Sequence, residues 1–185
     1  MNRPRTTGTI PAALAALALT AGLGLAWAPP APAAYCGITW GSTPKTAPAS
    51  SSAPVSDVRT GRHACFDRLV VDMSGPAPGY RVEYVPQFTG IGSGVPIPLR
   101  GAADLRVVLA APAYDDGHPT YSPADTWELV DVAGYSTFRQ IATAGSFEGS
   151  TELGVGVRAR LPVRAFVLAG PGAGSRLVVD VTHSW

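Results

Sequence analysis

The segment Asp115-Asp116-Gly117-His118 places two carboxylates beside an imidazole, side chains that can serve acid-base or metal chemistry. It lies in residues 113–125, the longest irregular stretch between the expected strands, and long loops often carry functional residues. Ca²⁺ requires six or more oxygen ligands, and the spacing is not that of an EF-hand. We interpret the segment as a solvated turn, and a hydrolase that uses the Asp115–His118 loop is the alternative.

The sequence lacks the signatures of several common enzyme classes. It contains no Gly-x-Ser-x-Gly, no His-Glu-x-x-His, no phosphate-binding loop and no Cys-x-x-Cys. Residues 154–159 match Gly-x-Gly-x-x-Ala, but Pro162 follows, so no helix N-terminus is available for a pyrophosphate. His63, His118 and His183 are scattered, and a Ser-His-Asp constellation formed by folding stays open. We expect no catalytic residues, no metal and no cofactor.

Cys36 and Cys65 are the only cysteines of the chain. An even number of cysteines in an exported chain predicts a disulfide. The bridge would stabilise the fold by about 3 to 4 kcal/mol in the loop-entropy model. A metal site that uses His63 beside Cys65 is the alternative, but it offers too few ligands at a recognised spacing.

The first 33 residues have the pattern of a signal peptide. Arg3 and Arg5 precede an apolar run over residues 10–28, and Ala31-Pro32-Ala33 fits a small-x-small cleavage site. Cleavage there would begin the mature chain at Ala34. An uncleaved anchor is the alternative, because the apolar run is just long enough to span a bilayer. We discount a lipoprotein at Cys36, because Tyr35 stands where a small residue is required.

Composition excludes some partner classes. Without Arg3 and Arg5, twelve basic residues face thirteen acidic ones, so the remainder is close to neutral. It has no basic stripe for nucleic acid and no polybasic cluster for an anionic membrane surface, so we expect no nucleic-acid partner and no membrane association after signal cleavage. About 150 residues suffice for one domain with its own core.

The sequence Arg-Leu-Val-Val-Asp occurs twice, at residues 68–72 and 176–180. In both copies the alternation predicts a strand with one apolar face and one face that carries an Arg and an Asp. If the copies pair antiparallel, Arg68 faces Asp180 and Arg176 faces Asp72, with opposite charges across the strands. If they lie in different sheets, each Asp instead holds a turn at its strand end. In either arrangement we interpret the four charged residues as structural and the repeat as a mark of internal symmetry.

Other segments with alternating or β-branched residues predict further strands between turn signals. They are residues 55–59, 66–73, 80–85, 104–111, 138–143, 151–158 and 164–168, with 95–99 as an edge or extended segment. We expect 66–73 and 80–85 to be hairpin neighbours. Gly154 and Gly156 leave one strand face bare, which indicates a close neighbouring backbone or ring, with a ligand groove as the alternative.

The predicted domain organisation has three parts. They are a signal peptide (1–33), an N-terminal arm with a Pro/Ser/Ala-rich linker (34–56) and a folded domain (57–185). Residues 43–56 contain too little apolar surface to order themselves, so we expect a linker there, with the arm tied back through Cys36.

The chain resembles a known family in several segments. Residues 67–76, 80–82 and 176–180 look like the two signature strands of the AMIN domain, found in N-acetylmuramoyl-L-alanine amidases and secretins. Residues 36–42, 61–68 and 149–157 resemble the AMIN-like domain of exported actinobacterial proteins. The resemblance implies an all-β fold, a β-sandwich of two similar, mainly antiparallel sheets with pseudo-symmetric halves. It also implies a secreted, cell-envelope location and a role in binding, with no catalytic residues.

These observations favour a non-catalytic envelope-binding module for peptidoglycan or a wall-associated protein, with a wall-directed hydrolase as the alternative. Glycan binding uses exposed aromatic rings, and stem-peptide carboxylates pair with arginine. On that basis we select as candidate binding residues Tyr84, Trp127, Arg81 and Arg158.

Overall fold

The computed structural model describes residues 34–49 and 51–185, and the predicted signal peptide and its cleavage site lie outside them. The described residues form strands joined by turns and loops, and no helix among them is long and apolar enough to cross a membrane. The strands are β1 (Ala34–Tyr35), β2 (Ile38–Thr39), β3 (Lys45–Ala47), β4 (Val55–Arg62), β5 (Phe66–Met73), β6 (Tyr80–Val85), β7 (Ala103–Leu109), β8 (Tyr114–Asp115), β9 (His118–Pro119), β10 (Phe138–Phe147), β11 (Ser150–Val157), β12 (Val163–Ala169) and β13 (Ser175–Thr182).

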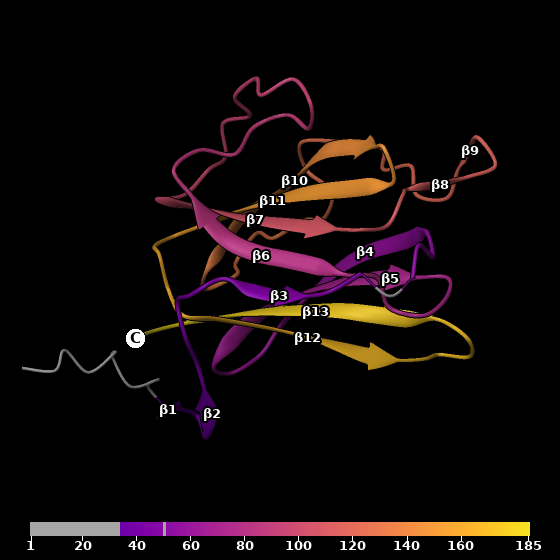
Figure 1. Cartoon of the computed structure of the whole chain (residues 1–185). Helices are drawn as coiled ribbons and strands as arrows, with labels where there is room; N and C mark the ends of the chain where they lie inside the picture. The colour runs from indigo at the N-terminus through magenta and orange to yellow at the C-terminus, as the bar shows by residue number, and fades with distance from the viewer. Residues whose placement is uncertain (1–33, 50) are drawn as a thin grey trace, which may run out of the picture. The chain divides into compact units, whose positions relative to one another are not determined.

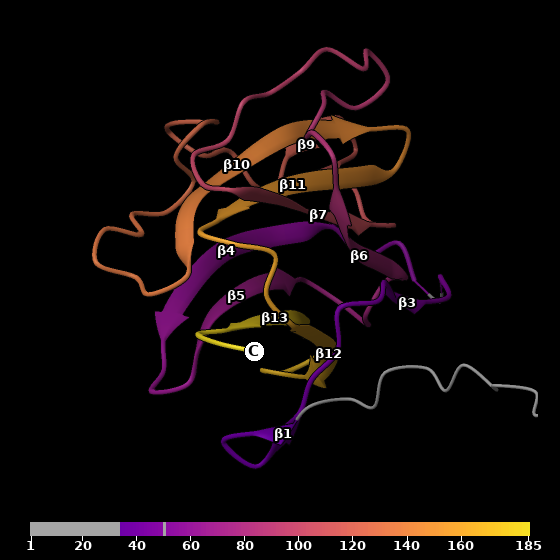
Figure 2. The same ribbon diagram turned by 90° about the vertical axis from the view of Figure 1, so that its left-hand side faces the viewer.

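Two antiparallel sheets face each other as a β-sandwich, which confirms the predicted fold class. One sheet has the strand order β10-β11-β7-β6-β3, and the other has the order β12-β13-β5-β4. Figures 1 and 2 show them as two stacked layers. Two small hairpins, β1–β2 and β8–β9, lie outside both sheets.

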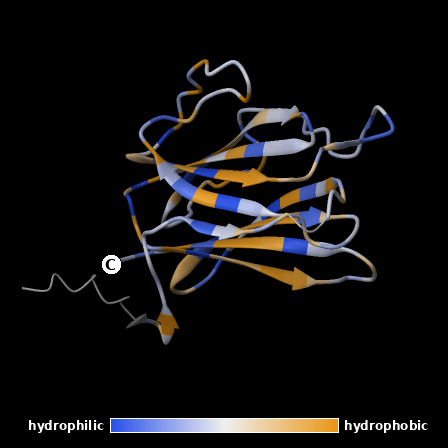
Figure 3. Ribbon diagram, in the orientation of Figure 1, coloured by the Kyte–Doolittle hydropathy of each residue, from blue (hydrophilic) through white to orange (hydrophobic). Residues whose placement is uncertain are grey.

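The core lies between the two sheets and is built from alternate residues of each strand. Figure 3 shows apolar stretches along strands of both layers, whereas the β8–β9 hairpin is mainly hydrophilic. Each fully buried Val or Leu contributes about 1.5 to 3 kcal/mol relative to an exposed one. The fully buried side chains include Leu69, Val71, Leu177 and Val179 of the four-stranded sheet and Val82, Leu105, Val107, Leu153 and Val155 of the five-stranded sheet.

The expectation that residues 66–73 and 80–85 form a hairpin is wrong. β5 pairs with β4 and β13, whereas β6 pairs with β7 and β3, so the two strands belong to different sheets. Residues 74–79, with Pro76 and Pro78, carry the chain from one layer to the other. The Tyr80 hydroxyl of β6 donates to the Ala165 carbonyl of β12 (3.2 Å), a bond that crosses between the sheets. The buried side chains of β5 and β6 therefore belong to one core between the two sheets.

The expected linker over residues 43–56 contains a strand. β3 pairs antiparallel with β6, with Lys45 opposite Val82 and Ala47 opposite Tyr80. Strand pairing uses backbone groups, so a segment of low hydrophobicity can supply it, and β3 covers the β6 edge of the sheet. The composition of residues 43–56 did not predict strand β3.

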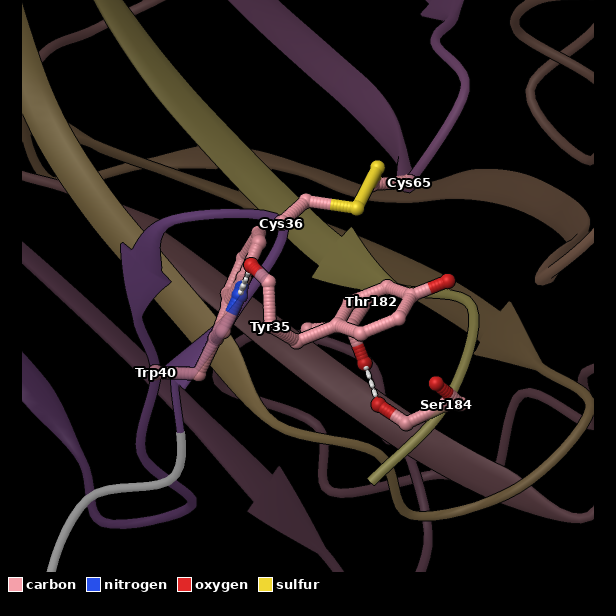
Figure 4. The surroundings of a disulfide bond; sticks show 6 residues. All are labelled: Tyr35, Cys36, Trp40, Cys65, Thr182 and Ser184. Carbon is pink, nitrogen blue, oxygen red and sulfur yellow. Dashed lines mark hydrogen bonds between the residues drawn. A yellow bond between two sulfur atoms is a disulfide. The ribbon is translucent and has the colours of Figure 1, made fainter.

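The N-terminal arm is fixed to the four-stranded sheet. Cys36 and Cys65 form the predicted disulfide, with 6.4 Å between their Cα atoms. Figure 4 shows Trp40 next to this bond, with its indole N–H donating to the Tyr35 carbonyl (3.0 Å). Trp40 is almost fully buried, and Gly41 pairs with Val163 of β12.

Gly154 and Gly156 of β11 face a covering segment of the chain. A Cβ on Gly154 would meet the ring of Phe88, and a Cβ on Gly156 would meet the carbonyl of Arg100. Phe88 is fully buried, and the backbone N–H of Arg100 donates to Gln140 (2.7 Å). The bare face is therefore filled by a ring and a backbone, as the first interpretation predicted, and not by a ligand groove among the described residues.

Candidate functional site

The two copies of the repeated motif lie side by side as β5 and β13 at the centre of the four-stranded sheet. Their antiparallel register is symmetric about the pair Val70 and Val178. Arg68 therefore lies opposite Asp180, and Arg176 lies opposite Asp72. The sequence left two arrangements open, and the structure has the antiparallel one rather than the copies in different sheets. Because Leu69 and Val71 point into the core, all four charged side chains belong to the outer face.

Asp180 binds two arginines. Arg68 donates to it through Nε (2.7 Å) and Nη2 (2.9 Å), and Arg164 of β12 donates through Nε (2.7 Å). Asp180 has no exposed surface. The hydrogen bonds with Asp180 raise the pKa of Arg68 above its ordinary value. Two charge-assisted bonds in parallel also fix the direction of the Arg68 guanidinium.

Aromatic rings contact the guanidinium groups of the same two arginines. The Arg164 guanidinium lies 5.2 Å from the ring centre of Trp40 and 5.3 Å from that of Phe66. Arg68 lies 5.1 Å from the centre of Phe66. Cation-aromatic contacts at this range add about 0.5 to 2 kcal/mol each. Arg164 thus joins the disulfide-bound arm to the sheet through Trp40, whereas Arg68 contacts rings of the sheet itself.

Asp72 does not repeat this arrangement. It accepts two hydrogen bonds from Arg59 of the neighbouring strand β4, from Nε (2.7 Å) and Nη2 (3.1 Å). Arg176, although opposite Asp72, donates only to the Ala169 carbonyl (3.3 Å). Its Nε is buried and has no partner among the described residues. Arg176 is therefore a cation without a carboxylate partner within the described chain.

A groove of about 240 Å³ opens beside Arg176 on this outer face. Val70 and Val178 form its floor, and both are buried. Gly61 lies opposite Arg68 in the β4–β5 pair, and its missing side chain leaves the groove open there. We call this feature the arginine groove, and its lining residues are Arg59, Thr60, Gly61, His63, Arg68, Val70, Leu168, Arg176 and Val178.

The arginine groove combines positive charge with an apolar floor. Arg59, Arg68 and Arg176 line it, and no Asp or Glu of the described chain does. Guanidinium groups bind carboxylates and phosphates through paired N–H donors. The valine floor suits a small apolar group attached to that anion. The arrangement can bind a carboxylate with a methyl-sized neighbour, such as the end of an alanine-containing peptide.

The structure does not gather the four binding residues selected from the sequence. The Tyr84 hydroxyl donates to the Leu161 carbonyl (2.8 Å), and burial raises the pKa of Tyr84 to about 12. Arg81 is exposed and pairs with Glu83 (2.5 Å). Arg158 donates to the His183 carbonyl. Trp127 is 48% exposed, in the loop before β10. None of the four lines the arginine groove.

The Asp115–His118 segment forms the turn of the β8–β9 hairpin. Asp116 and Gly117 both have positive φ, 45° and 79°, as a tight two-residue turn requires. The side chains of Asp115, Asp116 and His118 are exposed and make no hydrogen bond within the described chain. No cluster of three His, Cys, Asp or Glu residues that could hold a metal occurs in residues 34–49 and 51–185.

His183 forms the one close histidine-aspartate pair of the described residues. Its Nε2 lies 3.0 Å from Asp67, which is fully buried. The same carboxylate accepts the backbone N–H groups of Thr137 (2.5 Å) and Phe138 (3.0 Å). No serine hydroxyl of the described chain bonds this histidine. Asp67 thus ties the C-terminal segment and the start of β10 to β5.

Arg59, Gly61 and Arg164 of this face are not among the residues predicted from the sequence. Val58 is an inward residue, so strand alternation places Arg59 outward, and that signal was available. The neighbours of Arg59 and Arg164 depend on strand order, which a single sequence does not give. The unpaired state of Arg176 follows from the competition of Arg59 for Asp72.

Comparison with known proteins gives one match. A sequence model of the AMIN-like domain matches residues 53–183, which is more than half of the chain and includes the whole arginine groove. No curated protein and no solved structure matches the chain significantly.

Proposed function

The chain belongs to the AMIN-like domain family, and from this membership we propose that it is an exported, non-catalytic module that binds peptidoglycan. AMIN-like domains are extracytoplasmic binding modules related to the cell wall. The Cys36–Cys65 disulfide is consistent with that compartment. In this proposal residues 1–33 direct export, residues 34–56 are the arm, and residues 57–185 are the binding domain.

The observation that carries the proposal is the unpartnered Nε of Arg176 in the arginine groove. A buried donor without a partner costs about 1 to 3 kcal/mol, and a bound acceptor would recover that energy. Asp72, the nearest carboxylate across the strand pair, is held by two bonds from Arg59. No carboxylate of the described chain therefore neutralises Arg176, and a ligand acceptor is the partner that this proposal assigns to it.

Peptidoglycan offers a ligand of the required chemistry. Its stem peptides carry free carboxylates next to alanine methyl groups, which match the guanidinium groups and the valine floor of the arginine groove. A polymer presents many copies of this group, so modest affinity at each copy still gives retention through multiple attachment. Trp127 remains a proposed contact to the same polymer, because it is exposed, whereas Arg81 is held in an ion pair with Glu83.

The experiment is co-sedimentation of the purified protein with insoluble peptidoglycan. We expect the wild type in the pellet and an apparent affinity at least about tenfold lower for Arg176→Gln, because charge-assisted hydrogen bonds are lost. Arg81→Gln is the matched control, since it removes the same charge from the other sheet.

Thermal unfolding of each variant separates lost binding from lost fold. Arg176→Gln should unfold close to the wild-type temperature, because it loses no ion pair and only the long hydrogen bond from Nη2 to the Ala169 carbonyl (3.3 Å). Wild-type protein that stays entirely in the supernatant contradicts the proposal and favours an envelope protein as the partner. Equal loss of binding in Arg176→Gln and Arg81→Gln contradicts the assignment to the arginine groove.

A further inference from the structure

A second cavity, of about 410 Å³, lies between residues 113–126 and the ends of β10 and β11. In Figure 1 the β8–β9 hairpin extends beside the turn that joins β10 to β11. The backbone N–H of Gly149 in that turn donates to the Tyr114 hydroxyl of β8 (3.3 Å), so the two hairpins are in contact. A register shift in the β10–β11 pair at Thr143 and Gly145 borders the cavity. Such bulges often lie beside binding sites.

The lining of this cavity is uncharged. No Asp, Glu, Lys, Arg or His side chain of the described residues lines it, in contrast to the arginine groove. The rings of Tyr114 and Tyr121 supply apolar surface, and Pro119 and Pro123 add rigid walls. A charged ligand would find no partner here, because an unpaired charge loses solvation without compensation. We call this cavity the tyrosine groove.

The hydroxyl groups of the tyrosine groove divide into two sets. Thr143 and Thr151 already donate to backbone carbonyls, at 3.0 Å and 2.7 Å. The hydroxyls of Tyr121, Ser122 and Thr126 have no hydrogen-bond partner within the described chain. The free set can both donate and accept.

We propose that the tyrosine groove binds a neutral saccharide. A pyranose ring has an apolar C–H face, which packs on an aromatic ring, and a rim of hydroxyls, which need donors and acceptors that carry no charge. Tyr114 and Tyr121 offer the rings, and Ser122 and Thr126 offer the free hydroxyls. The volume lies within the range of small-molecule sites, about 300 to 1,000 Å³.

Trp127 is an exposed aromatic residue next to the lining of the tyrosine groove. It directly follows Thr126 of the lining in the chain and is 48% exposed. A large exposed ring beside a hydroxyl-lined groove extends the surface available to a chain of several sugars. We therefore choose an oligosaccharide rather than a single sugar as the probe.

This inference deepens the proposed function, because the glycan strand is the second component of the same wall polymer. The two sites call for separate probes. Tri-N-acetylchitotriose carries no carboxylate and no peptide, so it tests the tyrosine groove without the arginine groove. Failure with this sugar leaves the carboxylate proposal intact, and loss of peptidoglycan binding in Arg176→Gln leaves the saccharide site intact.

The experiment is a calorimetric titration of the purified protein with tri-N-acetylchitotriose. We expect saturable binding, weakened at least tenfold by Tyr114→Ala and several-fold by Tyr121→Phe. Tyr135→Phe is the matched control, because its hydroxyl bonds Thr60 (2.8 Å) and its ring lines a different cavity. Arg176→Gln should bind the sugar as the wild type does.

Tyr121→Phe keeps the ring and removes only an unpartnered hydroxyl, so it should leave the unfolding temperature unchanged. That variant keeps the test valid if Tyr114→Ala unfolds. Absence of saturable binding to the wild type overturns the proposal. Wild-type affinity in both Tyr114→Ala and Tyr121→Phe also overturns it.

Discussion

Arg176 lies directly opposite Asp72 in the β13–β5 pair, yet Asp72 forms its ion pair with Arg59 of β4. The symmetry-related pair, Arg68 and Asp180, is closed by two hydrogen bonds. The pair Arg68 and Asp180 thus forms a closed ion pair. In the second pair, Arg176 has no carboxylate partner within the described chain. The difference arises from the neighbours, because β4 presents Arg59 to Asp72 and β12 presents Arg164 to Asp180.

Replacement of the buried aspartate of this face should be costly. Asp180→Asn leaves the Arg68 and Arg164 charges without their carboxylate, and breaking a buried ion pair costs about 3 kcal/mol or more. Asp72→Asn is the matched control, because Arg59 is half exposed and such pairs contribute about 1 kcal/mol or less. Urea unfolding of both variants measures the difference. Equal losses in the two variants contradict the assigned roles.

The disulfide should contribute measurably to stability. Cys36 and Cys65 lie 29 positions apart, and the loop-entropy model gives about 3 to 4 kcal/mol for a closed loop of this size. We expect Cys36→Ala/Cys65→Ala to unfold at a lower urea concentration by a corresponding amount. Thiol titration of the unfolded, unreduced wild type gives an independent check, since two free thiols there exclude the bond.

The close approach of Phe88 to β11 predicts that alanine substitutions at Gly154 and Gly61 differ in their effect on stability. Gly154→Ala places a methyl group against the buried Phe88 ring and should destabilise the protein by about 1 to 3 kcal/mol. Gly61→Ala should change stability little, because its nearest neighbour would be the His63 imidazole at 3.5 Å. Phe88→Leu combined with Gly154→Ala should recover part of the loss. Chemical unfolding of the wild type and these three variants measures the differences in stability. Unchanged stability in Gly154→Ala would contradict the prediction.

Glu83 should make stability depend on pH in the acid range. Hydrogen bonds from Arg81 and then Arg106 lower the pKa of Glu83 from 4.5 to about 2. A folded-state pKa below the unfolded value gives stability that is present above about pH 4.5 and is lost as pH falls toward 2. Glu83→Gln should therefore flatten the stability curve between these values. A curve identical to that of the wild type contradicts the role of this carboxylate.

The sequence revealed those features of the fold that depend on alternation within a strand. The β-branched runs of residues 66–73 and 176–181 predicted strands with one charged face, and charge complementarity gave the register that the two copies would have if they paired antiparallel, which they do. The cysteine count predicted the disulfide, and the paired glycines of β11 predicted a close neighbour. Each of these inferences uses only local geometry or a pair of residue types.

Features that depend on the order of strands in a sheet could not be predicted from the sequence. β5 and β6 have apolar faces that suit a hairpin and also suit opposite sheets, and only the path of residues 74–79 decides between them. β3 joins its sheet through backbone bonds that leave no pattern in its side chains. The arginine groove needs β4 and β12 beside the repeated strands, so its members Arg59 and Leu168 could not be placed together from the sequence.

Chemical neutralisation of the ligand tests the central claim most directly. Insoluble peptidoglycan is amidated at its free carboxylates with ammonium chloride and a carbodiimide, which leaves the glycan strands intact. Co-sedimentation with this polymer is compared with that of untreated polymer. If the arginine groove binds stem-peptide carboxylates, the wild type should lose at least about tenfold in affinity on amidation, whereas Arg176→Gln should bind both polymers equally weakly. Equal binding of the wild type to native and amidated peptidoglycan would contradict the account.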